Sequence, residues 1–339
     1  MATQDYVYLD PEAVSSGSYG TVYRALQVPK SSVDEALLVE DSHDLDDHRD
    51  LQLEMANIDR SQGVRVALKR ISLFPGPRDR VRTSAREELA ALMDCNHTNI
   101  VPVLDSFESA DSQEMYIAFP FIDKSLTDIL EESHDGMPLY RTCYLLCQLF
   151  AGLDHLHSKG YVHRDVKPAN VLVTHGDHLY LTDFGLVRPS TDVVTPNAVT
   201  RAYRAPELLL GCPRTTPAAD VYAGGAVAYE LLTGRVLAGC GSDIEQILNL
   251  HSIVGPFSTL VWPDIEVMCP DFDKIHLPHV EGLQRGVKAS LAKYNVPEEA
   301  VSIVLETLHP DPTQRPSASA VSEAWLSLAK KIRAVQTYK

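Results

Sequence analysis

Residues 163–170 read HRDVKPAN, and this stretch decides the fold when it is taken together with two others. Residues 66–69, VALK, come before it, and residues 183–185, DFG, come after it. Residues 205–207, APE, close the series. Each of these motifs alone could arise by chance. Their occurrence together, in this order, predicts one catalytic arrangement that extends over nearly the whole chain, from about Tyr6 to Leu326.

A fifth stretch lies upstream and is ambiguous by itself. Residues 15–22, SSGSYGTV, have the spacing of a glycine-rich phosphate loop, with Ser15 in the place of the first glycine. Two glycines at this spacing also occur in ordinary turns, because glycine adopts a positive φ without strain. The stretch therefore predicts either a working nucleotide loop or a degenerate copy of one.

The length and composition indicate two lobes that share a substantial core. The chain has 339 residues, of which 45% are apolar. The N-terminus, MATQDYVYLD, is polar and acidic, and no run of about 18 apolar residues follows, so we expect no signal peptide and no membrane span. We therefore expect an intracellular protein, in the nucleus or the cytoplasm. The formal net charge of -16 argues against a nucleic-acid partner, because a phosphate backbone would be repelled.

Much of the negative charge lies in an insertion at about residues 29–63. Between Lys30 and Arg60 the chain carries ten acidic and three basic residues, a net charge of -7. Such a composition favours a solvated segment, and the alternative is a docking surface for a basic partner.

The cysteines show no metal-binding or redox motif. No C-x-x-C pair occurs, and Cys143 and Cys147 fall one helical turn apart on an apolar face. We expect all six cysteines to be reduced thiols in or near the core; they are at positions 95, 143, 147, 212, 240 and 269.

The order of predicted elements indicates an α+β fold. Strand-like segments rich in β-branched and aromatic residues fill the first third, and one amphipathic helix at residues 83–96 interrupts them. Helical segments dominate from about residue 124. We predict an N-terminal lobe at 1–122 with an antiparallel sheet, a larger helical lobe at 123–326 and a C-terminal tail at 327–339. Such an arrangement leaves a cleft between the lobes.

In this order and spacing, the motifs resemble the signature set of the eukaryotic protein kinases. The resemblance implies the kinase fold and the transfer of the γ-phosphoryl group of ATP with Mg²⁺. Because every charged catalytic residue is present, it also favours a working glycine-rich loop, in which the first position tolerates a small side chain such as Ser15.

The resemblance also assigns roles to single residues. Asp165 would accept the proton of the substrate hydroxyl, and Lys167 would lie along the γ-phosphate. Lys69 would hold the α and β phosphates and pair with a glutamate of the helix. Glu87 and Glu88 compete for that pairing, and we choose Glu88 because Leu89, Leu92 and Cys95 then keep the buried spacing. Asn170 and Asp183 would bind Mg²⁺, which prefers hard oxygen ligands.

The nucleotide contacts follow in the same way. The glycine-rich strands, the strand that carries Lys69 and the hinge after Phe119 would surround the base and the phosphates. The residues concerned are Val14, Ser15, Gly17, Gly20, Val22, Ala67, Lys69, Phe119, Pro120, Phe121, Ile122 and Leu172.

Within the kinases, HRDVKPAN resembles the serine/threonine type, and several segments resemble the cyclin-dependent kinases of the CMGC group. RTSAREEL, at residues 82–89, stands where that family carries its cyclin-binding helix, and TRAYRAPELLLG resembles its activation segment. The resemblance implies substrates with Ser/Thr-Pro. In that family the backbone carbonyl at the residue matching Val199 turns toward the arginine matching Arg204, so no acceptor is left for the substrate's backbone N–H. Proline, which has no N–H, is therefore favoured. The resemblance also implies a cyclin-like partner on the Arg82–Leu92 helix.

Three regulatory hypotheses come from the same resemblance. Thr195 occupies the activating phosphorylation position, where Arg164 and Arg188 would clamp the phosphate. The third arginine of the family clamp is replaced by Glu87, with Arg86 displaced by one residue. Ser18 and Tyr19 stand where family members accept inhibitory phosphates.

Two alternatives stay open at this point. The chain could be a catalytically weak pseudokinase or scaffold that binds partners through the acidic insertion, or a kinase that needs no cyclin. Roles in the cell cycle and in transcription are equally compatible with the sequence. Three further residues are predicted to be structural: Asp220 anchors the catalytic loop, and Glu207 pairs with Arg315.

Overall fold

The fold is described from a computed structural model. It covers residues 3, 5–17, 20–32, 61, 63–73, 78–109, 113–133, 135–192, 201–239, 241–280 and 282–337. The chain divides into two compact units, which are described separately: residues 1–93 with 101–122, and residues 94–100 with 123–339. Ile122 is the last residue of the first unit, and residues 94–100 belong to the second unit.

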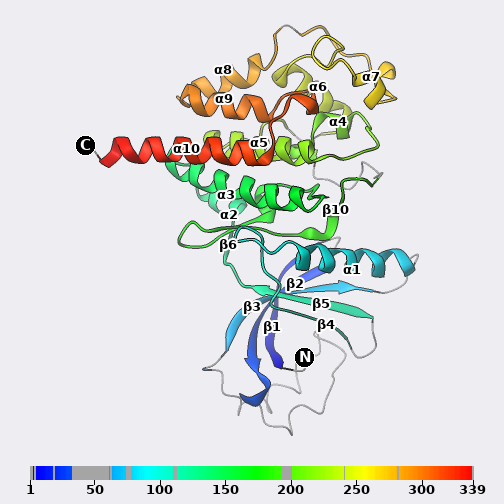
Figure 1. The fold of residues 1–339 in the computed structure, drawn as a ribbon, viewed down its shortest axis with the longest axis vertical. Coiled ribbons are helices and arrows are strands. Elements are labelled where there is room, and N and C mark those ends of the chain that lie inside the picture. The colour runs from blue at the N-terminus through cyan, green and yellow to red at the C-terminus, as the bar shows by residue number, and fades with distance from the viewer. Residues whose placement is uncertain are drawn as a thin grey trace. The chain divides into compact units, whose positions relative to one another are not determined.

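The first unit is an antiparallel sheet with the strand order β1-β2-β3-β5-β4 (Figure 1). One face of this sheet carries a buried aromatic and aliphatic cluster that includes Tyr8, Tyr23, Val66 and Leu68. Helix α1 follows β3 along the chain. The elements are β1 (Tyr6–Gly17), β2 (Gly20–Pro29), the short 3-10 turn η1 (Lys30–Ser32), β3 (Val64–Ser72), α1 (Arg78–Asp94), β4 (Asp105–Glu108) and β5 (Glu114–Pro120).

The second unit is mainly helical and carries two small sheets. Its strands are β6 (Lys124–Ser125), β7 (Tyr161–Val162), β8 (Val171–Val173), β9 (Leu179–Leu181) and β10 (Arg188–Pro189). Its helices are α2 (Leu126–Glu132), α3 (Leu139–Ser158), α4 (Pro206–Leu209), α5 (Pro217–Thr233), α6 (Asp243–Val254), α7 (Ile265–Met268), α8 (Arg285–Lys293), α9 (Glu298–Thr307) and α10 (Ala318–Thr337). The 3-10 turns are η5 (Pro168–Asn170), η6 (Phe184–Leu186), η8 (Arg201–Tyr203), η9 (Phe272–Lys274) and η10 (Pro312–Gln314).

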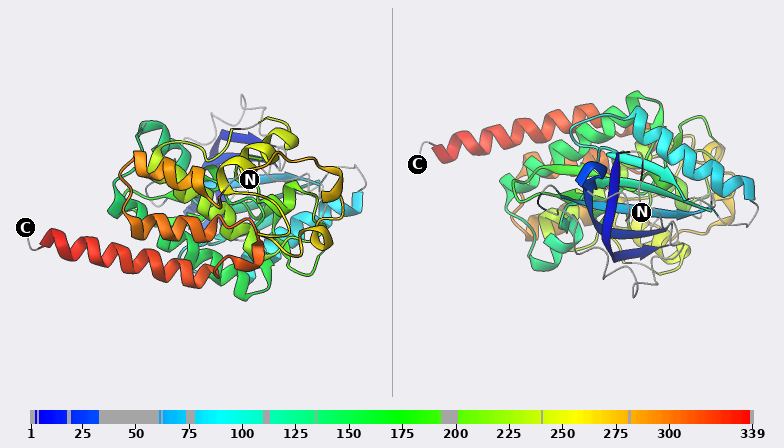
Figure 2. Two further views of the ribbon diagram at one scale, coloured as in Figure 1. Left: turned by 90° about the horizontal axis from the view of Figure 1, so that it is seen from above. Right: turned by 90° about the horizontal axis from the view of Figure 1, so that it is seen from below.

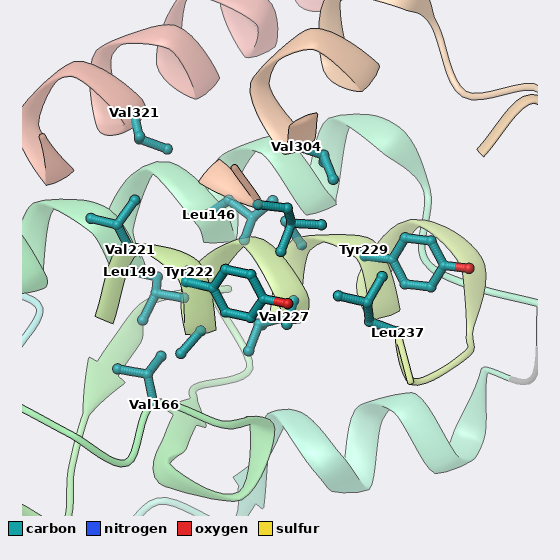
Figure 3. Close-up of a cluster of buried hydrophobic side chains, with 14 of the residues drawn as sticks. Leu146, Leu149, Val166, Val221, Tyr222, Val227, Tyr229, Leu237, Val304 and Val321 are labelled. Atoms are coloured by element: carbon teal, nitrogen blue, oxygen red, sulfur yellow. The ribbon is translucent and has the colours of Figure 1, made fainter. Parts of the chain in front are cut away.

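Helix α5 is the centre of this second core. Figure 3 shows its side chains, among them Tyr222 and Val227, packed between residues of α3, α9 and α10. Two adjacent glycines permit this close packing, because a Cβ at Gly224 would lie 2.6 Å from the ring of Phe150 on α3. Val166 of the HRDVKPAN stretch joins the same cluster and is 2% exposed. The catalytic motif is therefore anchored directly on the hydrophobic core.

The C-terminal tail predicted at residues 327–339 is wrong over most of its length. Helix α10 continues through residue 326 to Thr337 and packs along α3 (Figures 1 and 2). The reason is the apolar periodicity, which places Trp325, Leu328 and Ala329 in the core at 0%, 5% and 4% exposure.

The expectation that all six cysteines are reduced is also wrong. Cys212, after α4, and Cys269, after α7, form a disulfide with their Cα atoms 4.5 Å apart. They are separated by 57 residues, so only the tertiary fold brings them together. Cys95, Cys143 and Cys147 are buried free thiols, as expected.

Candidate active site

The lysine of the VALK stretch lies on the second face of the N-terminal sheet. Val66 and Leu68, both 0% exposed, point into the opposite cluster, so the period-2 geometry of the strand directs Ala67 and Lys69 to the other side. Lys69 pairs with Val22 of β2, and Ala67 pairs with Phe119 of β5. Cross-strand partners share a face, so four of the predicted nucleotide contacts lie together on one surface.

Glu88 of α1 pairs with this lysine. Its Oε1 accepts a hydrogen bond from the Nζ of Lys69 at 2.7 Å, and the two side chains are 4% and 10% exposed. Glu87, the competing candidate, is exposed. The helical periodicity explains the difference, because Ala85 and Leu92, at 2% and 4% exposure, fall on the buried face of the helix with Glu88.

The glycine-rich stretch forms the hairpin between β1 and β2. Gly17 pairs with Gly20, and Ser15 pairs with Val22. Gly20 has φ +136°, and a Cβ there would collide with the carbonyl oxygen of Arg70, so this glycine is required. Ser15 is an exposed strand residue without a positive φ, so its position accepts a side chain. The intermediate residues Ser18 and Tyr19 lie outside the described part of the chain.

The remaining nucleotide contacts predicted from the sequence belong to both units. Val14 is 47% exposed on β1. Pro120 ends β5, and the backbone N–H of Phe121 donates to the carbonyl of Arg65 at 3.4 Å. Ile122 is the last residue of the first unit, and Leu172 lies on β8 of the second.

The catalytic loop of the second unit is held by Asp220 of α5. Its carboxylate, 1% exposed, accepts hydrogen bonds from the backbone N–H of His163 at 2.7 Å and of Arg164 at 2.8 Å. The Nε2 of His157 lies 2.8 Å from the same carboxylate. Arg164 has a left-handed φ of 72°, a strained conformation for a residue with a side chain, and these bonds hold it in place.

The charge state of Asp220 follows from these contacts. Burial by itself would raise the pKa of this carboxyl group. The hydrogen bond from His157, the nearby histidine rings and the N–H of Arg164 outweigh burial, so the pKa lies below its ordinary value. Asp220 is therefore an ionised anchor inside the core.

Asp165 presents a buried carboxylate with defined partners. Its Oδ2 accepts from the Nζ of Lys167 at 2.6 Å and from the Nδ2 of Asn170 at 2.9 Å. Its backbone N–H donates to the Nδ1 of His163, and the Nε2 of His163 lies 3.0 Å from the carbonyl of Thr182. Since Nδ1 accepts, the proton of a neutral His163 belongs on Nε2. The ring thereby connects the HRD and DFG stretches.

Asn170 and Asp183 lie at the same end of a hairpin. Val171 begins β8 and pairs with Leu181, the last residue of β9, and the N–H of Thr182 donates to the carbonyl of Asn170 at 3.0 Å. Asp183 follows in a left-handed conformation, with φ 62°. The Nδ2 of Asn170 is already used by Asp165, which leaves the amide oxygen as its ligand atom. One amide and one carboxylate oxygen fit Mg²⁺ chemically.

The predicted phosphate clamp is only partly described. Arg188 on β10 pairs with Val162 of β7, which precedes Arg164 by two residues, so the two arginines come from adjacent segments. The Nη1 of Arg188 donates to the carbonyl of Val187, and the Nη1 of Arg164 donates to the carbonyl of Leu186. Thr195 lies outside the described residues. In the first unit, the displaced Arg86 forms an exposed ion pair with Glu108 at 3.2 Å.

The ion pair predicted between Glu207 and Arg315 is present and buried. Two parallel hydrogen bonds of 2.7 and 2.8 Å join the groups, whose side chains are 3% and 0% exposed. It fixes α4, which contains Glu207 of the APE motif, to the residue that follows η10.

Sequence reasoning did not find two functional contacts. The contact between His157 and Asp220 is not predicted from the sequence, although His157 lies in the last turn of α3, shortly before the catalytic loop. Asp243 of α6, which contacts Arg201 and Arg204, gave no signal, because only the tertiary fold brings α6 to this segment.

Comparison with known proteins agrees with this geometry. The protein kinase domain family matches residues 55–326, most of the chain, and the chain belongs to that family. The match begins after β1 and β2, so the glycine-rich hairpin lies before the matched region. The expected α+β kinase fold is thereby confirmed.

Two relatives indicate the branch of the family. The chain is 29% identical over 267 residues to a probable cyclin-dependent kinase 10 of Dictyostelium discoideum, covering 77% of this chain and 71% of that protein. It is also 29% identical over 253 residues to mitogen-activated protein kinase 12 of Mus musculus, covering 74% of this chain and 59% of that protein. The chain is thus similar to kinases of the CMGC group, as its motifs indicate.

A search of the described helices for a membrane span found no candidate of sufficient length and apolarity.

Proposed function

We propose that this protein kinase transfers the γ-phosphoryl group of ATP, with Mg²⁺, to serine and threonine hydroxyls of proteins. The observation that carries the proposal is the buried carboxylate of Asp165, held at Oδ2 by Lys167 and Asn170. A carboxylate fixed in this way can accept the hydrogen bond of a substrate hydroxyl and then its proton.

The other residues support the same reaction. Lys69, paired with Glu88, provides a fixed positive charge for the phosphates of the nucleotide. Val22, Ala67 and Phe119 provide an apolar face for its base. Asn170 and Asp183 supply the oxygen ligands of Mg²⁺, which would neutralise charge on the phosphate oxygens. Lys167 supplies a second positive charge next to the proton acceptor.

The test is ³²P transfer from ATP and Mg²⁺ to serine, threonine and tyrosine peptides. Asp165→Asn should lower kcat by about 10²–10⁴-fold, because it removes the proton acceptor and keeps the shape of the side chain. Asp271→Asn changes an exposed aspartate of the same unit and should be neutral. Equal turnover of wild type and Asp165→Asn would contradict the proposal. Inactivity without stabilisation by nucleotide would favour the scaffold alternative.

We propose proline-directed specificity as a finer property of the same site. The argument rests on the resemblance at Val199, which lies outside the described residues, and at Arg204, which is 4% exposed. A substrate position without a partner for its backbone N–H favours proline, which has none. Equal kcat/KM for matched Ser-Pro and Ser-Ala peptides would overturn this assignment.

A cyclin-like subunit is the partner that we propose for helix α1, over Arg82–Leu92. Loss of the third clamp arginine favours the alternative that the kinase orders its own active state. Comparing transfer by the purified chain alone with transfer in a cell extract separates the two. We further propose a nuclear or cytoplasmic location, which fractionation would test. Phosphorylation of Thr195, Ser18 and Tyr19 stays a hypothesis from the family resemblance, and phosphosite mapping of the active protein would test it.

A further inference from the structure

A cluster of three charged side chains lies where η8 meets α6. Arg201 donates through Nε to the Oδ1 of Asp243 at 2.8 Å, and the Nη1 of Arg204 lies 3.5 Å from the same oxygen. The side chain of Gln246, on the next turn of α6, donates to the backbone carbonyl of Arg201 at 3.4 Å. The carboxylate of Asp243 thus accepts hydrogen bonds from two guanidinium groups.

The cluster lies next to the catalytic loop. Arg204 and Tyr203 line a small void of about 10 Å³ together with Arg164 and Asp220, the residues that fix the loop. The hydroxyl of Tyr203 donates to Glu230 of α5 at 2.7 Å, which fixes this turn to the central helix. Arg201 begins the same turn, η8, two residues before Tyr203.

The two arginines differ in exposure. The side chain of Arg204 is 5% exposed, whereas that of Arg201 is 53% exposed. Burial, together with the charge of Arg201, lowers the pKa of Arg204 below its ordinary value, although the carboxylates of Asp243 and Asp165 oppose the shift. Arg204 is therefore a structural charge inside the protein, and Arg201 is a surface charge.

Arg201 keeps hydrogen-bonding capacity. A guanidinium has five N–H donors. Those of Arg201 reach Asp243 through Nε and the carbonyl of Gly241 through Nη1, and among the described residues its Nη2 has no hydrogen-bond partner. The other acid at the start of α6, Glu245, is bound to the N–H and hydroxyl of Ser242 as a helix cap. Within the described part of the chain it forms no ion pair with Arg201.

We propose that Arg201 selects protein substrates that carry an anionic side chain, a carboxylate or a phosphate, close to the acceptor hydroxyl. Guanidinium groups bind both chemistries through paired N–H donors. Asp243 takes the place of this anion when no substrate is bound, and the substrate competes with it for Arg201. The proposal rests on the proposed kinase function and identifies a specificity-determining residue for it.

The test uses sets of four serine peptides. Within a set the peptides differ at one position near the acceptor serine, and the sets place this varied position at each flanking residue in turn. The position carries alanine, aspartate, phosphoserine or lysine, and the aspartate and phosphoserine arms separate the two anions. At the best position, wild type should prefer an anionic peptide over alanine by about fivefold in kcat/KM, the size expected of an exposed charge pair. The difference should be in KM.

Three variants make the test specific. Arg201→Gln should abolish the preference and leave kcat for the alanine peptide unchanged. Lys293→Gln removes an exposed cation from α8 and should keep the preference. Asp243→Asn should raise the ratio above that of wild type, because it removes the competitor.

Peptide binding is measured as well as kcat/KM, by the fluorescence anisotropy of labelled peptides. The proposal can therefore be tested even if the protein phosphorylates none of the peptides. Equal binding and kcat/KM of anionic and neutral peptides at every position would overturn the proposal. A preference that persists in Arg201→Gln would also overturn it, as would a general loss of activity in that variant. If wild type phosphorylates no peptide, the kinase proposal fails, while a binding preference lost in Arg201→Gln would still support the anion site.

Discussion

Replacing Arg315 by methionine should destabilise the second unit strongly, because this arginine satisfies a buried carboxylate and several backbone groups at once. Its Nη1 and Nη2 donate to the two oxygens of Glu207 at 2.7 and 2.8 Å. Its Nε, Nη1 and Nη2 also donate to the carbonyls of His309, Ala218 and Pro310. All five N–H donors are thereby used.

The magnitude follows from the burial of the pair. Without Arg315, the carboxylate of Glu207, at 3% exposure, has lost its cation inside the core. Removing one partner of such a pair costs about 3–5 kcal/mol, most of it the penalty for the uncompensated charge. Removing both charges is far less costly, so Arg315→Met with Glu207→Leu should recover about 2 kcal/mol or more of that loss.

The chain provides its own probe for this measurement. Its only two tryptophans, Trp262 and Trp325, are both in the second unit and 0% exposed. Their fluorescence during urea unfolding therefore reports on that unit. Lys288→Met, which breaks an exposed pair with Glu298, is the control and should change stability by less than about 1 kcal/mol. A loss below about 1 kcal/mol for Arg315→Met, or a double variant no better than the single one, would refute the reasoning.

Two further predictions use the same fluorescence transition. The folded-state pKa of Asp220 lies below its ordinary value, so its stabilisation is present above the unfolded-state pKa of about 4 and is lost as the pH falls through the folded value. Asp220→Asn should be less stable at neutral pH and should lose less on acidification, and parallel pH profiles would contradict this. Reduction of the Cys212–Cys269 disulfide should cost about 4 kcal/mol for a loop of 57 residues. Cys269→Ser should equal the reduced wild type, and a midpoint insensitive to reductant would disprove the contribution.

The principal residues of the candidate site could be predicted because they lie in motifs that resemble those of the protein kinases, and local regularity then determined how their neighbours are arranged. Strand alternation around Lys69 determines which side chains share its face, and helix periodicity decides between Glu87 and Glu88. Both arguments need only a few neighbouring residues. The same regularity predicted the helix at residues 83–96, which the fold contains as α1 (Arg78–Asp94).

The features that could not be predicted depend on contacts between distant segments. The disulfide joins cysteines 57 residues apart, and no local pattern marks them. Asp243 lies about 40 residues after Arg201 and Arg204 in the sequence. Only the packing of α6 brings its Oδ1 to 2.8 Å from the Nε of Arg201 and 3.5 Å from the Nη1 of Arg204. The continuation of α10 to Thr337 differs from these cases, because it depends on a local pattern. The apolar periodicity of the helix can be read in the sequence beyond residue 326, where a tail is predicted.

Burial of charge separates Arg201 from the residues that the kinase motifs identify. Lys69, Asp165 and Asp220 are each at least nine-tenths buried in the fold. An ionised group in such a place is too costly to keep unless partners compensate it, and each of these three has such partners. Arg201 is half exposed and bears no such cost. Its role in substrate choice can therefore be inferred only from its partners in the folded protein.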